Sequence, residues 1–406
     1  MESERPGSKA QPRLPLTGIR VLEFTHAVMG PSCGVILADL GAEVVTVEPP
    51  EGSPTRELRG FGSGYFPYFG RSKKSLCLDL KSETGRSTAR ALTVKADVLI
   101  ENFAPGTMER LGLGEVDCQK LNPRLIYCSM KGFLAGPYEQ RAALDEVVQM
   151  MGGLAYMTGP TGRPLRVGTS VVDIAGGMFG VIGILAALRA RDQSGEGQTL
   201  RSSLFETTAF LMGQHLAWSV IAEQPIPPMP ERTSAWAVYQ IFATRDDPIF
   251  IGVISEKHWH SFCKAFARLD LLARPEFASN NLRIEARDLL LPDLKQMLAG
   301  FTRAEAMERC ERAGLPFAPI ARPEDLFDDP QLNHGGLESM RFPDGREGKL
   351  PRLPLEWNGQ RIPFRSAPPA IGEHGSDVLQ HWLGWSPDAI EAVLHTKTKS
   401  HAPTDG

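Results

Sequence analysis

The sequence lacks most of the short motifs that identify nucleotide-dependent enzymes and hydrolases. It contains no G-x-x-x-x-G-K-[ST] phosphate-binding loop, and no G-x-G-x-x-G turn follows the first expected strand, residues 19–24. The G-x-S-x-G turn of serine hydrolases is also missing. The sequence therefore does not support the P-loop, dinucleotide-dependent or serine-hydrolase classes, and its chemistry must be sought in other residues.

Net charge and paired cysteines are also scarce. The formal net charge is −4 and 23% of the residues are charged, so we expect no nucleic-acid and no membrane partner. The longest apolar run, Ile174–Leu188, is too short and too rich in glycine to cross a bilayer. None of the six cysteines forms a C-x-x-C pair, a pattern typical of reduced thiols in a cytoplasmic protein.

The N-terminal segment has no apolar signal region, and Glu2 and Glu4 argue against a transit peptide. We therefore expect residues 1–15 to form a disordered tail. The chain has 406 residues, of which 42% are hydrophobic, and this is enough for two or three domains with cores of their own.

From residue 16 to about residue 206, segments typical of strands and helices alternate. The strand-like runs are short and apolar, and helical patterns such as Glu83–Ala96 lie between several of them. This alternation predicts an α/β fold built from βαβ units, with a mostly parallel sheet and helices on both faces. The expected strands are IRVLEF, EVVTVE, SLCLDL, ADVLIEN and RLIYCSM.

Two helices are expected before the first domain ends. Residues 175–191 are apolar nearly all round, which predicts a buried helix, and residues 205–222 predict a second one. The proline-rich segment EQPIPPMPERTSAW then excludes a helix interior or a central strand. We place a domain boundary there. The expected parts are a large domain at 16–224, a smaller inserted α+β domain at 225–330, and a linker with a C-terminal return to the large domain at 331–406.

The small domain is expected to start with a hairpin, because WAVYQIFATRDDPIFIGVI contains two strand-like runs around a turn at Arg245–Pro248. Helical patterns near Glu256–Ala267 and Glu305–Ala313 follow in the same domain. Two short helices, near Glu373–Leu383 and Pro387–Leu394, are expected to close the chain.

The loop RSKKS gathers Arg71, Lys73 and Lys74 just before an expected strand. Arginine offers forked donors and lysine a point charge to phosphate groups, so the loop is a candidate phosphate site. The alternative is an ordinary solvated turn.

The segment ENFAPGTMERLGL follows the strand ADVLI directly and places Asn102 beyond its carboxyl end. Ligands of open α/β sheets bind at such positions. Pro105 and Gly106 predict a helix start, whose N-terminus attracts anions, and Arg110 lies one turn further on. The alternative is a plain connection between strand and helix.

A single acid, Asp173, interrupts the small and apolar residues of RVGTSVVDIAGGMFG. Burying a charge is costly unless the charge is used or compensated. Asp173 could cap the helix that follows it, or it could be a partly buried carboxylate nucleophile. His258 and His260 flank Trp259, but a solvated helix start explains them more simply than a metal pair, and we expect no metal site.

The order of these segments resembles the family III CoA-transferases, a family that includes formyl-CoA transferase and the carnitine CoA-transferases. The resemblance is carried by LTGIRVLEFTHAVMGP, LGAEVVTVEPP, ENFAPGTMERLGLG, LNPRLIYCSMKGF, TSVVDIAGGMFGVIGILAAL and GEGQTLRSSLFE. It covers nearly all of residues 16–210 and is weaker beyond them. It implies a Rossmann-like large domain made from both ends of the chain, an inserted small domain, and an interlocked homodimer.

The resemblance also implies a mechanism. Asp173 matches the aspartate that attacks the acyl-CoA, forming a mixed anhydride and then an aspartyl-CoA thioester, from which a small carboxylic acid receives CoA. No permanently bound cofactor is needed, because coenzyme A is a substrate. A water-poor pocket would protect the intermediates.

Further site residues follow from the same resemblance. The implied CoA-binding residues are His26, Arg71, Lys73, Lys74, Asn102, Phe103 and Arg110. Asp145 is a candidate for substrate binding, and N–H groups around Gly176 and Gly177 could stabilise oxyanions. The candidates for holding the acceptor carboxylate are Arg141, which we prefer, Arg166 and Arg232.

The sequence departs from the family pattern in places. Val28 stands where formyl-CoA transferase carries a glutamine, Pro49 replaces a CoA-contacting arginine, and the glycine-run loop of the second domain is missing. These departures put formate and oxalate in doubt as substrates. Acyl-CoA racemases of the same fold carry a histidine where Leu144 precedes Asp145, so a racemase or lyase ranks second. A non-catalytic acyl-CoA-binding protein is the remaining alternative.

Overall fold

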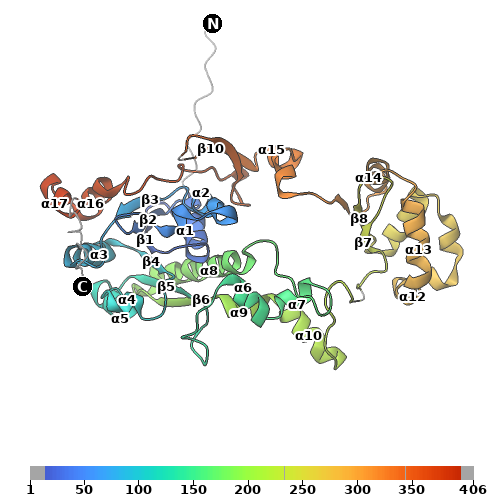
Figure 1. Ribbon diagram of the computed structural model, residues 1–406, viewed down its shortest axis with the longest axis horizontal. Helices are drawn as coiled ribbons and strands as arrows, with labels where there is room; N and C mark the ends of the chain where they lie inside the picture. Colours follow the sequence, from blue (N-terminus) through green and yellow to red (C-terminus); the bar gives the residue numbers. More distant parts are fainter. Residues whose placement is uncertain (1–13, 233, 343, 395–406) are drawn as a thin grey trace, which may run out of the picture. The chain divides into compact units, whose positions relative to one another are not determined.

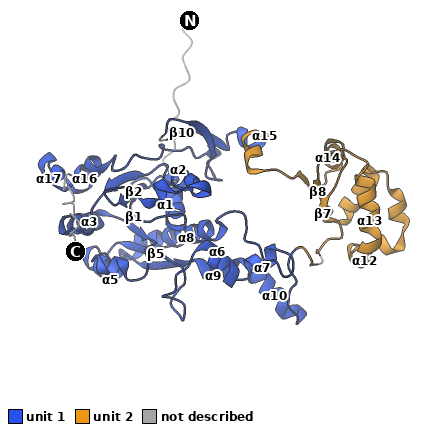
Figure 2. Ribbon diagram, viewed as in Figure 1, with its two compact units in different colours: residues 1–229, 331–406 blue, residues 230–330 orange. Residues whose placement is uncertain are grey.

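The computed structural model describes residues 14–232, 234–342 and 344–394; most of the expected N-terminal tail, residues 1–13, lies outside this part of the chain. The chain divides into two compact units, one made of Met1–Met229 with Gln331–Gly406 and the other of Pro230–Pro330 (Figure 2). The first division falls within the proline-rich segment. The larger unit is therefore made from two separate parts of the chain, one on each side of the smaller unit in the sequence.

The larger unit is built on a six-stranded parallel sheet with the order β3-β2-β1-β4-β5-β6. Since β1 pairs with both β2 and β4, the strand order reverses between β1 and β4. This arrangement confirms the expected α/β fold class with a Rossmann-like sheet. The strands are β1 (Arg20–Phe24), β2 (Glu43–Glu48), β3 (Lys74–Cys77), β4 (Val98–Glu101), β5 (Ile126–Lys131) and β6 (Thr199–Ser203).

Helices pack on both faces of this sheet (Figure 1). On one face, α1 (Met29–Asp39) and α8 (Val171–Ser194) cover strand side chains such as Val21 and Ile126. On the other face, α3 (Glu83–Lys95), α5 (Glu115–Leu121) and α16 (Gly375–Leu383) cover Leu22 and Leu99. Because α16 contacts α3, the C-terminal part of the chain completes a layer begun by the N-terminal part.

The long helix α8 differs from its expected form. It has 24 residues, so the apolar run is part of a helix long enough, and apolar enough, to cross a membrane. The core helix of a globular domain meets the same criteria, and α8 packs against α1, β5 and β6. It is not buried all round, however, because Met178 is 50% exposed and Ile182 is 59% exposed.

The helix expected at residues 205–222 is divided in two. The structure has α9 (Leu204–Leu211) and α10 (Gly213–Ala222), separated at Met212. Large apolar side chains of both helices are exposed, among them Phe210 and Ile221.

A C-terminal segment lies along the free edge of β3 next to the loop that precedes it. The Ser72 N–H donates to the Ser366 carbonyl at 3.0 Å, and the Arg365 N–H donates to the Ser72 hydroxyl at 3.1 Å. Further along, the His374 N–H donates to the Ser75 carbonyl at 3.0 Å. This segment pairs an edge that would otherwise expose unpaired backbone groups.

The smaller unit is an α+β structure with a three-stranded sheet of order β7-β8-β9. The expected hairpin is present, because β7 (Tyr239–Phe242) and β8 (Ile249–Gly252) pair antiparallel with Phe242 opposite Ile249. β9 (Phe317–Pro319) adds to β8. The core of this unit contains Trp259 and Phe262. Its helices are α11 (Glu256–Ala265), α12 (Asn280–Glu285), α13 (Arg287–Leu298) and α14 (Arg303–Arg312).

The remaining elements are short. The helices are η1 (Pro54–Glu57), η2 (Gly60–Gly64), α2 (Tyr65–Phe69), α4 (Thr107–Arg110), α6 (Asp145–Met151), α7 (Leu154–Thr158), η3 (Leu269–Ala273), η4 (Pro275–Phe277), η5 (Pro323–Phe327), α15 (Pro330–Asn333) and α17 (Pro387–Leu394). The strands are β10 (Leu337–Arg341), β11 (Glu347–Pro351), β12 (Glu356–Trp357) and β13 (Gln360–Arg361).

Candidate active site

The carboxyl ends of β1 and β4 form the crevice at which the strand order of the sheet reverses, where open α/β sheets bind their ligands. Two loops meet there. The His26 N–H donates to Asn102 Oδ1, and Asn102 Nδ2 donates to the His26 carbonyl, both at 2.9 Å. The His26 ring stacks on Phe103 with a centroid distance of 5.8 Å. The structure thus brings together three of the residues expected to bind CoA.

Arg110 lies in the loop and short helix that follow β4. Its side chain is exposed, and Arg110 Nη2 donates to the Thr107 hydroxyl at 2.9 Å. No carboxylate in the described part of the chain forms an ion pair with it. The helix itself, α4, has only four residues, so it has little dipole of its own to attract an anion. The cation, not the helix terminus, is the anion-attracting feature here.

The RSKKS loop has a different role from the one expected. Arg71 is 2% exposed; its Nη2 lies 2.9 Å from Asp39 Oδ2, and its guanidinium lies between the rings of Tyr68 and Phe364. Because this cation is buried and neutralised, Arg71 is not available to a phosphate group in this conformation.

The two lysines of the loop are also paired. Lys73 is 4% exposed, with Nζ at 2.8 Å from Glu23, and Lys74 Nζ lies 2.8 Å from Glu43 and 2.6 Å from Asp377. Lys73 is therefore unavailable to a phosphate in this conformation. Lys74 is 30% exposed but lies between two carboxylates, so the cationic loop serves to hold the sheet and the C-terminal segment together.

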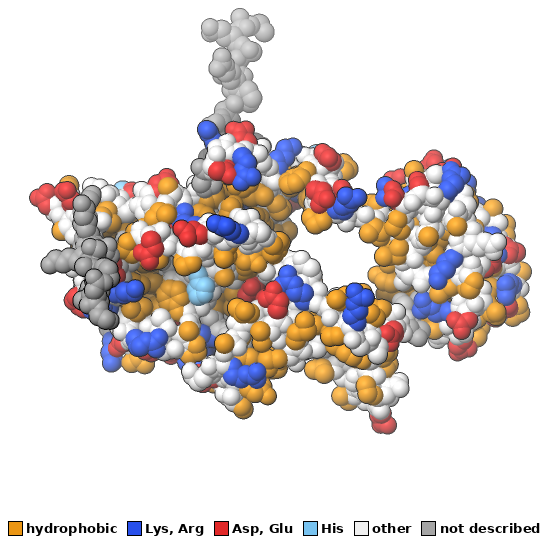
Figure 3. All heavy atoms as spheres, viewed as in Figure 1, with side chains coloured by type: hydrophobic (Ala, Val, Ile, Leu, Met, Phe, Trp, Pro, Cys, Tyr) orange, Lys and Arg blue, Asp and Glu red, His pale blue; other side chains and the backbone are white. Residues whose placement is uncertain are grey.

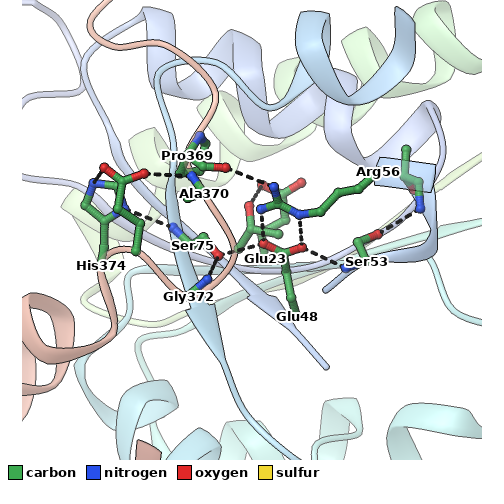
Figure 4. A network of polar contacts seen from close by, with 12 residues as sticks. Glu23, Glu48, Ser53, Arg56, Ser75, Pro369, Ala370, Gly372 and His374 are labelled. Atoms are coloured by element: carbon green, nitrogen blue, oxygen red, sulfur yellow. Dashed lines mark hydrogen bonds and ion pairs between the residues drawn. The ribbon is translucent and has the colours of Figure 1, made fainter. Parts of the chain in front are cut away.

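The acid at the end of β2 is fully occupied. Glu48 accepts hydrogen bonds from the Ser53 N–H, the Ser75 hydroxyl and two nitrogens of Arg56, whose Nη1 donates to the Pro369 carbonyl (Figure 4). In dinucleotide-binding sheets an acid near this position holds a ribose. Since all its acceptor positions are used, Glu48 has none left for a ribose, in agreement with the missing glycine motif.

Asp173 is the third residue of α8 and not the residue that caps it. The helix begins at Val171, and the preceding Ser170 makes no capping hydrogen bond with its side chain. The Asp173 carboxylate has no hydrogen-bond donor among the described residues. Desolvation by burial, followed by the negative charges of Asp145 and Glu146, raises the pKa of Asp173 to about 7. This carboxylate is therefore unpaired and perturbed, a combination typical of functional sites.

Asp145, expected to bind substrate, instead contacts the start of α8. It is 4% exposed, and its Oδ2 accepts from the Val172 N–H at 2.9 Å and the Asp173 N–H at 3.1 Å. The preceding Leu144 is 67% exposed. Asp145 thus takes the hydrogen bonds that a capping side chain would accept.

The β1–α1 loop and the start of α8 belong to one packed region. Val28 is buried in a cluster against which Ile174, the neighbour of Asp173, packs. The Tyr65 hydroxyl lies 3.5 Å from the Ser170 hydroxyl, and Tyr65 also lines a small cavity together with His26. The loop that carries His26 and the residues before Asp173 therefore share neighbours.

The similarity of this chain to known proteins extends over most of its length. The description of CoA-transferase family III matches residues 16–375. The chain belongs to this family. Succinyl-CoA:glutarate CoA-transferase of Mus musculus is 31% identical over 398 residues, which cover 96% of this chain and 91% of that protein. Acetyl-CoA:oxalate CoA-transferase of Acetobacter aceti is 34% identical over 382 residues, with 92% and 97% covered.

Solved structures agree with this assignment. A CAIB/BAIF family protein from Brucella suis superposes with a TM-score of 0.80 at 30% identity, covering 91% of this chain and 100% of that one. A hypothetical protein from Mycobacterium tuberculosis gives the same TM-score of 0.80 at 31% identity, with 91% and 99% covered. The expected family is confirmed, and the protein is an enzyme of the CoA-transferase type that acts on acyl-CoA and carboxylates.

Two glycines of this transferase, which are the candidates for stabilising oxyanions, have a packing role in the structure. Gly176 and Gly177 are buried in α8 beyond its first turn, where backbone N–H groups bond within the helix. A Cβ on Gly177 would lie 2.0 Å from Ser32 Oγ, and one on Gly176 would lie 2.6 Å from Met29 Cε. Both glycines therefore allow α1 to approach α8 closely.

Of the three arginine candidates for the acceptor carboxylate, Arg141 and Arg166 belong to the same unit as Asp173, and neither is paired with it. Arg141 is exposed and lies over the ring of Tyr138 at 4.9 Å. Arg166 forms an ion pair with Glu146, and Arg232 belongs to the smaller unit. Arg166 is linked to Asp173 through this ion pair, because its partner Glu146 raises the pKa of Asp173.

The two histidines of the smaller unit, His258 and His260, lie in the first half of α11. His260 Nδ1 lies 2.9 Å from the Glu256 carbonyl of its own helix. Within the described residues, no three His, Cys, Asp or Glu side chains converge as metal ligands.

Proposed function

We propose that this enzyme transfers CoA from an acyl-CoA to a small carboxylic acid through covalent intermediates on Asp173. The observation that carries the proposal is the state of Asp173. Its carboxylate is held at the start of an apolar helix, has no hydrogen-bond partner among the described residues, and has a pKa raised to about 7. A structural carboxylate would be expected to accept hydrogen bonds or to form an ion pair.

The proposed chemistry consists of four balanced acyl transfers. The Asp173 carboxylate attacks the acyl-CoA carbonyl and expels the CoA thiolate, which gives a mixed anhydride. The thiolate then attacks the Asp173 carbonyl of the anhydride and expels the donor carboxylate, which leaves an aspartyl-CoA thioester. The acceptor carboxylate repeats the first step on this thioester, and the thiolate then attacks the acceptor carbonyl. New acyl-CoA leaves and the Asp173 carboxylate is regenerated without oxidant, metal or water.

For the CoA moiety we propose the crevice between β1 and β4. His26, Asn102 and Phe103 lie at its mouth, and the exposed, unpaired Arg110 supplies a positive charge for a phosphate group. Arg71 and Lys73 are left out because their charges are buried in ion pairs.

For the acceptor we propose a small dicarboxylic acid. The names of the similar enzymes include glutarate, oxalate and D-citramalate as the acids concerned, and all three carry more than one carboxylate. Val28 in place of the glutamine of formyl-CoA transferase argues for testing glutarate-like acids before oxalate. No observation favours a racemase, because Leu144 has no group that could exchange a proton.

We also propose that the enzyme is a homodimer. Several large apolar side chains of α8, α9 and α10 are exposed, and hydrophobic side chains are visible on this part of the surface in Figure 3. Extended apolar patches are uncommon on monomers. The residues are Met178, Ile182, Phe210, Leu216, Val220 and Ile221.

The mechanism is tested by trapping the thioester. Wild-type enzyme is incubated with succinyl-CoA or acetyl-CoA and a panel of carboxylic acids, and the products are identified by mass spectrometry. Hydroxylamine added during turnover should modify the peptide that contains Asp173. Asp173→Asn should bind CoA but give neither product nor modified peptide. The matched control is Asp192→Asn, an exposed acid of the same helix, which should remain active; modification elsewhere, or an active Asp173→Asn enzyme, would contradict the mechanism.

A further inference from the structure

The N-terminus of α8 is capped by the side chain of a residue from another helix. The N-terminal N–H groups of a helix are usually satisfied by the side chain of the residue that precedes it, which accepts from the second or third helical residue. Here Ser170 makes no such bond. The second and third N–H groups, those of Val172 and Asp173, donate instead to one oxygen of Asp145 on α6.

Asp145 is itself held in place. Its other oxygen accepts from the side-chain amide of Gln149, one turn further along α6. The carbonyl oxygen of that amide accepts from the Val167 N–H at 2.9 Å. Gln149 is fully buried. The pair Asp145 and Gln149 therefore fixes the chain on both sides of the bend that leads into α8.

This arrangement affects what the Asp173 side chain can do. A carboxylate at the third position of a helix can turn back toward the free N–H groups of the first turn and be held there. Since Asp145 already occupies two of these groups, the Asp173 carboxylate is left without a hydrogen bond. The same contacts fix the Asp173 main chain, from which the carboxylate projects.

We propose that Asp145, supported by Gln149, is a positioning residue of the transferase: it replaces the cap of α8, keeps the Asp173 carboxylate free for attack, and places its own negative charge beside Asp173. The inference rests on the proposed function of Asp173 as nucleophile. It does not make Asp145 a proton donor or a substrate ligand.

The electrostatic part of the inference depends on the charges around Asp173. α6 contributes Asp145 and Glu146, both of which raise the pKa of Asp173. The charged groups on the elements packed against α8 are engaged elsewhere: Asp39 of α1 with Arg71, Lys131 of β5 with Glu101, Arg201 of β6 with Glu139, and Glu206 of α9 with Ser203. Near the start of α8, Arg166 pairs with Glu146, and the Tyr65 hydroxyl lies near that of Ser170.

Two substitutions of Asp145 distinguish its role as a hydrogen-bond acceptor for α8 from the effect of its negative charge on Asp173. Asp145→Asn keeps an oxygen that can accept from Val172 and Asp173 but removes the negative charge. Its new amide nitrogen faces that of Gln149, so a small loss of stability is expected. Asp145→Ala removes both the charge and the acceptor. In the alanine variant the Asp173 carboxylate is free to occupy the N–H groups of the first turn.

The measurements are pH profiles of kcat, CoA affinity, and the titration of the Asp173 carboxyl followed by carbon NMR. For Asp145→Asn the midpoints of the acid limb and of the NMR titration should move to lower pH by roughly one unit, with the kcat plateau changed little. For Asp145→Ala the plateau should also fall, by roughly tenfold to a hundredfold. The dissociation constant for CoA should change less than about twofold in both, because neither variant touches the crevice.

Three controls make the outcome decisive. Asp192→Asn should leave the profile unchanged, and Asp173→Asn identifies the Asp173 signal by its loss. Thermal unfolding shows whether a variant is folded. The positioning role would be overturned if the titration midpoints of wild type and Asp145→Asn were equal and the kcat plateau of Asp145→Ala were as high as that of wild type. Failure of the wild-type enzyme to form a hydroxylamine-sensitive intermediate would instead overturn the proposed function, and the NMR titration would still report on Asp145.

Discussion

Replacing Asp173 by asparagine should remove activity and at the same time make the folded protein more stable. The reason is the cost of keeping a charged carboxylate in this place. Burial and two neighbouring acids raise the pKa of Asp173 from 3.8 to about 7. A carboxyl whose pKa is raised on folding stabilises the protein only while it is protonated, and this contribution is lost as the pH rises through the folded-state value.

The magnitude follows from the two pKa values. They differ by about 3 units, and each unit corresponds to about 1.4 kcal/mol, so the ionised form costs up to about 4 kcal/mol above pH 7. Asparagine has no charge, but its amide would be partly buried without a partner, which costs about 1 kcal/mol. We therefore expect the substitution to raise the free energy of unfolding by about 3 kcal/mol at pH 8. At pH 5 the increase should be less than about 1 kcal/mol, because Asp173 of the folded wild type is then mostly protonated and most of the ionisation cost is absent.

The assay is thermal unfolding of wild type and Asp173→Asn at several pH values between 5 and 8. A gain of this size corresponds to a midpoint roughly 5 °C higher at pH 8 in a protein of this size, and the difference should shrink as the pH falls. Asp192→Asn is the control, because that side chain is exposed on the same helix. If the unfolding midpoint of Asp173→Asn is equal to or lower than that of wild type, or if the difference does not depend on pH, the reasoning is refuted. Asp173 would then be an ordinary acid in the first turn of a helix.

Four further predictions concern other parts of the molecule. Transfer by the wild type should rise as the pH increases through about 7, the pKa of Asp173, because the ionised form is the nucleophile; a pH–rate profile tests this. Arg110→Ala should raise the dissociation constant for CoA roughly tenfold and reduce its salt dependence in titration calorimetry, whereas Arg124→Ala, at the amino edge of the sheet, should not. Gly177→Ala should lower stability by about 1–3 kcal/mol in thermal unfolding, because its Cβ would lie 2.0 Å from Ser32 Oγ, whereas Gly183→Ala, with 3.4 Å to Leu200, should not lower it. Arg71→Met should cost about 3–5 kcal/mol by leaving Asp39 buried and unpaired, with little effect on CoA affinity.

The sheet could be predicted from the sequence because its strands are marked locally. The first five strands each lie in a short apolar run, as buried parallel strands require, whereas β6 contains a single large apolar residue, Leu200. The position of Asn102 beyond β4 followed from the same pattern. The break between α9 and α10 at Met212 is marked in the sequence only by Gly213, and a single glycine weakens a helix without necessarily ending it.

The roles of charged residues were harder to predict because their partners are distant in the sequence. The RSKKS loop looks like a phosphate site when its partners are unknown, yet Glu23, Asp39 and Asp377 neutralise its three cations. In the same way, Asp173 could be taken for a helix cap because it stands just before the apolar run. The oxygen that accepts from the first turn of α8 belongs instead to Asp145, in an earlier helix. Burial and pairing are properties of the folded chain, and sequence spacing does not report them.

The cost of ionised Asp173 has a consequence for the proposed reaction. In the mixed anhydride, the CoA thiolate can attack either carbonyl, and the carboxylate with the lower pKa is the better leaving group. Small carboxylic acids in water have pKa values of about 4, whereas that of Asp173 is raised to about 7. Attack at the Asp173 carbonyl expels the substrate acid, which is the better leaving group. It is therefore favoured over attack at the substrate carbonyl, which would expel the Asp173 carboxylate and re-form the donor acyl-CoA. The aspartyl-CoA thioester is also uncharged at Asp173, so its formation relieves the same burial and repulsion that destabilise the resting protein. The free energy that the fold spends on this carboxylate thus favours the intermediate that must wait for the acceptor.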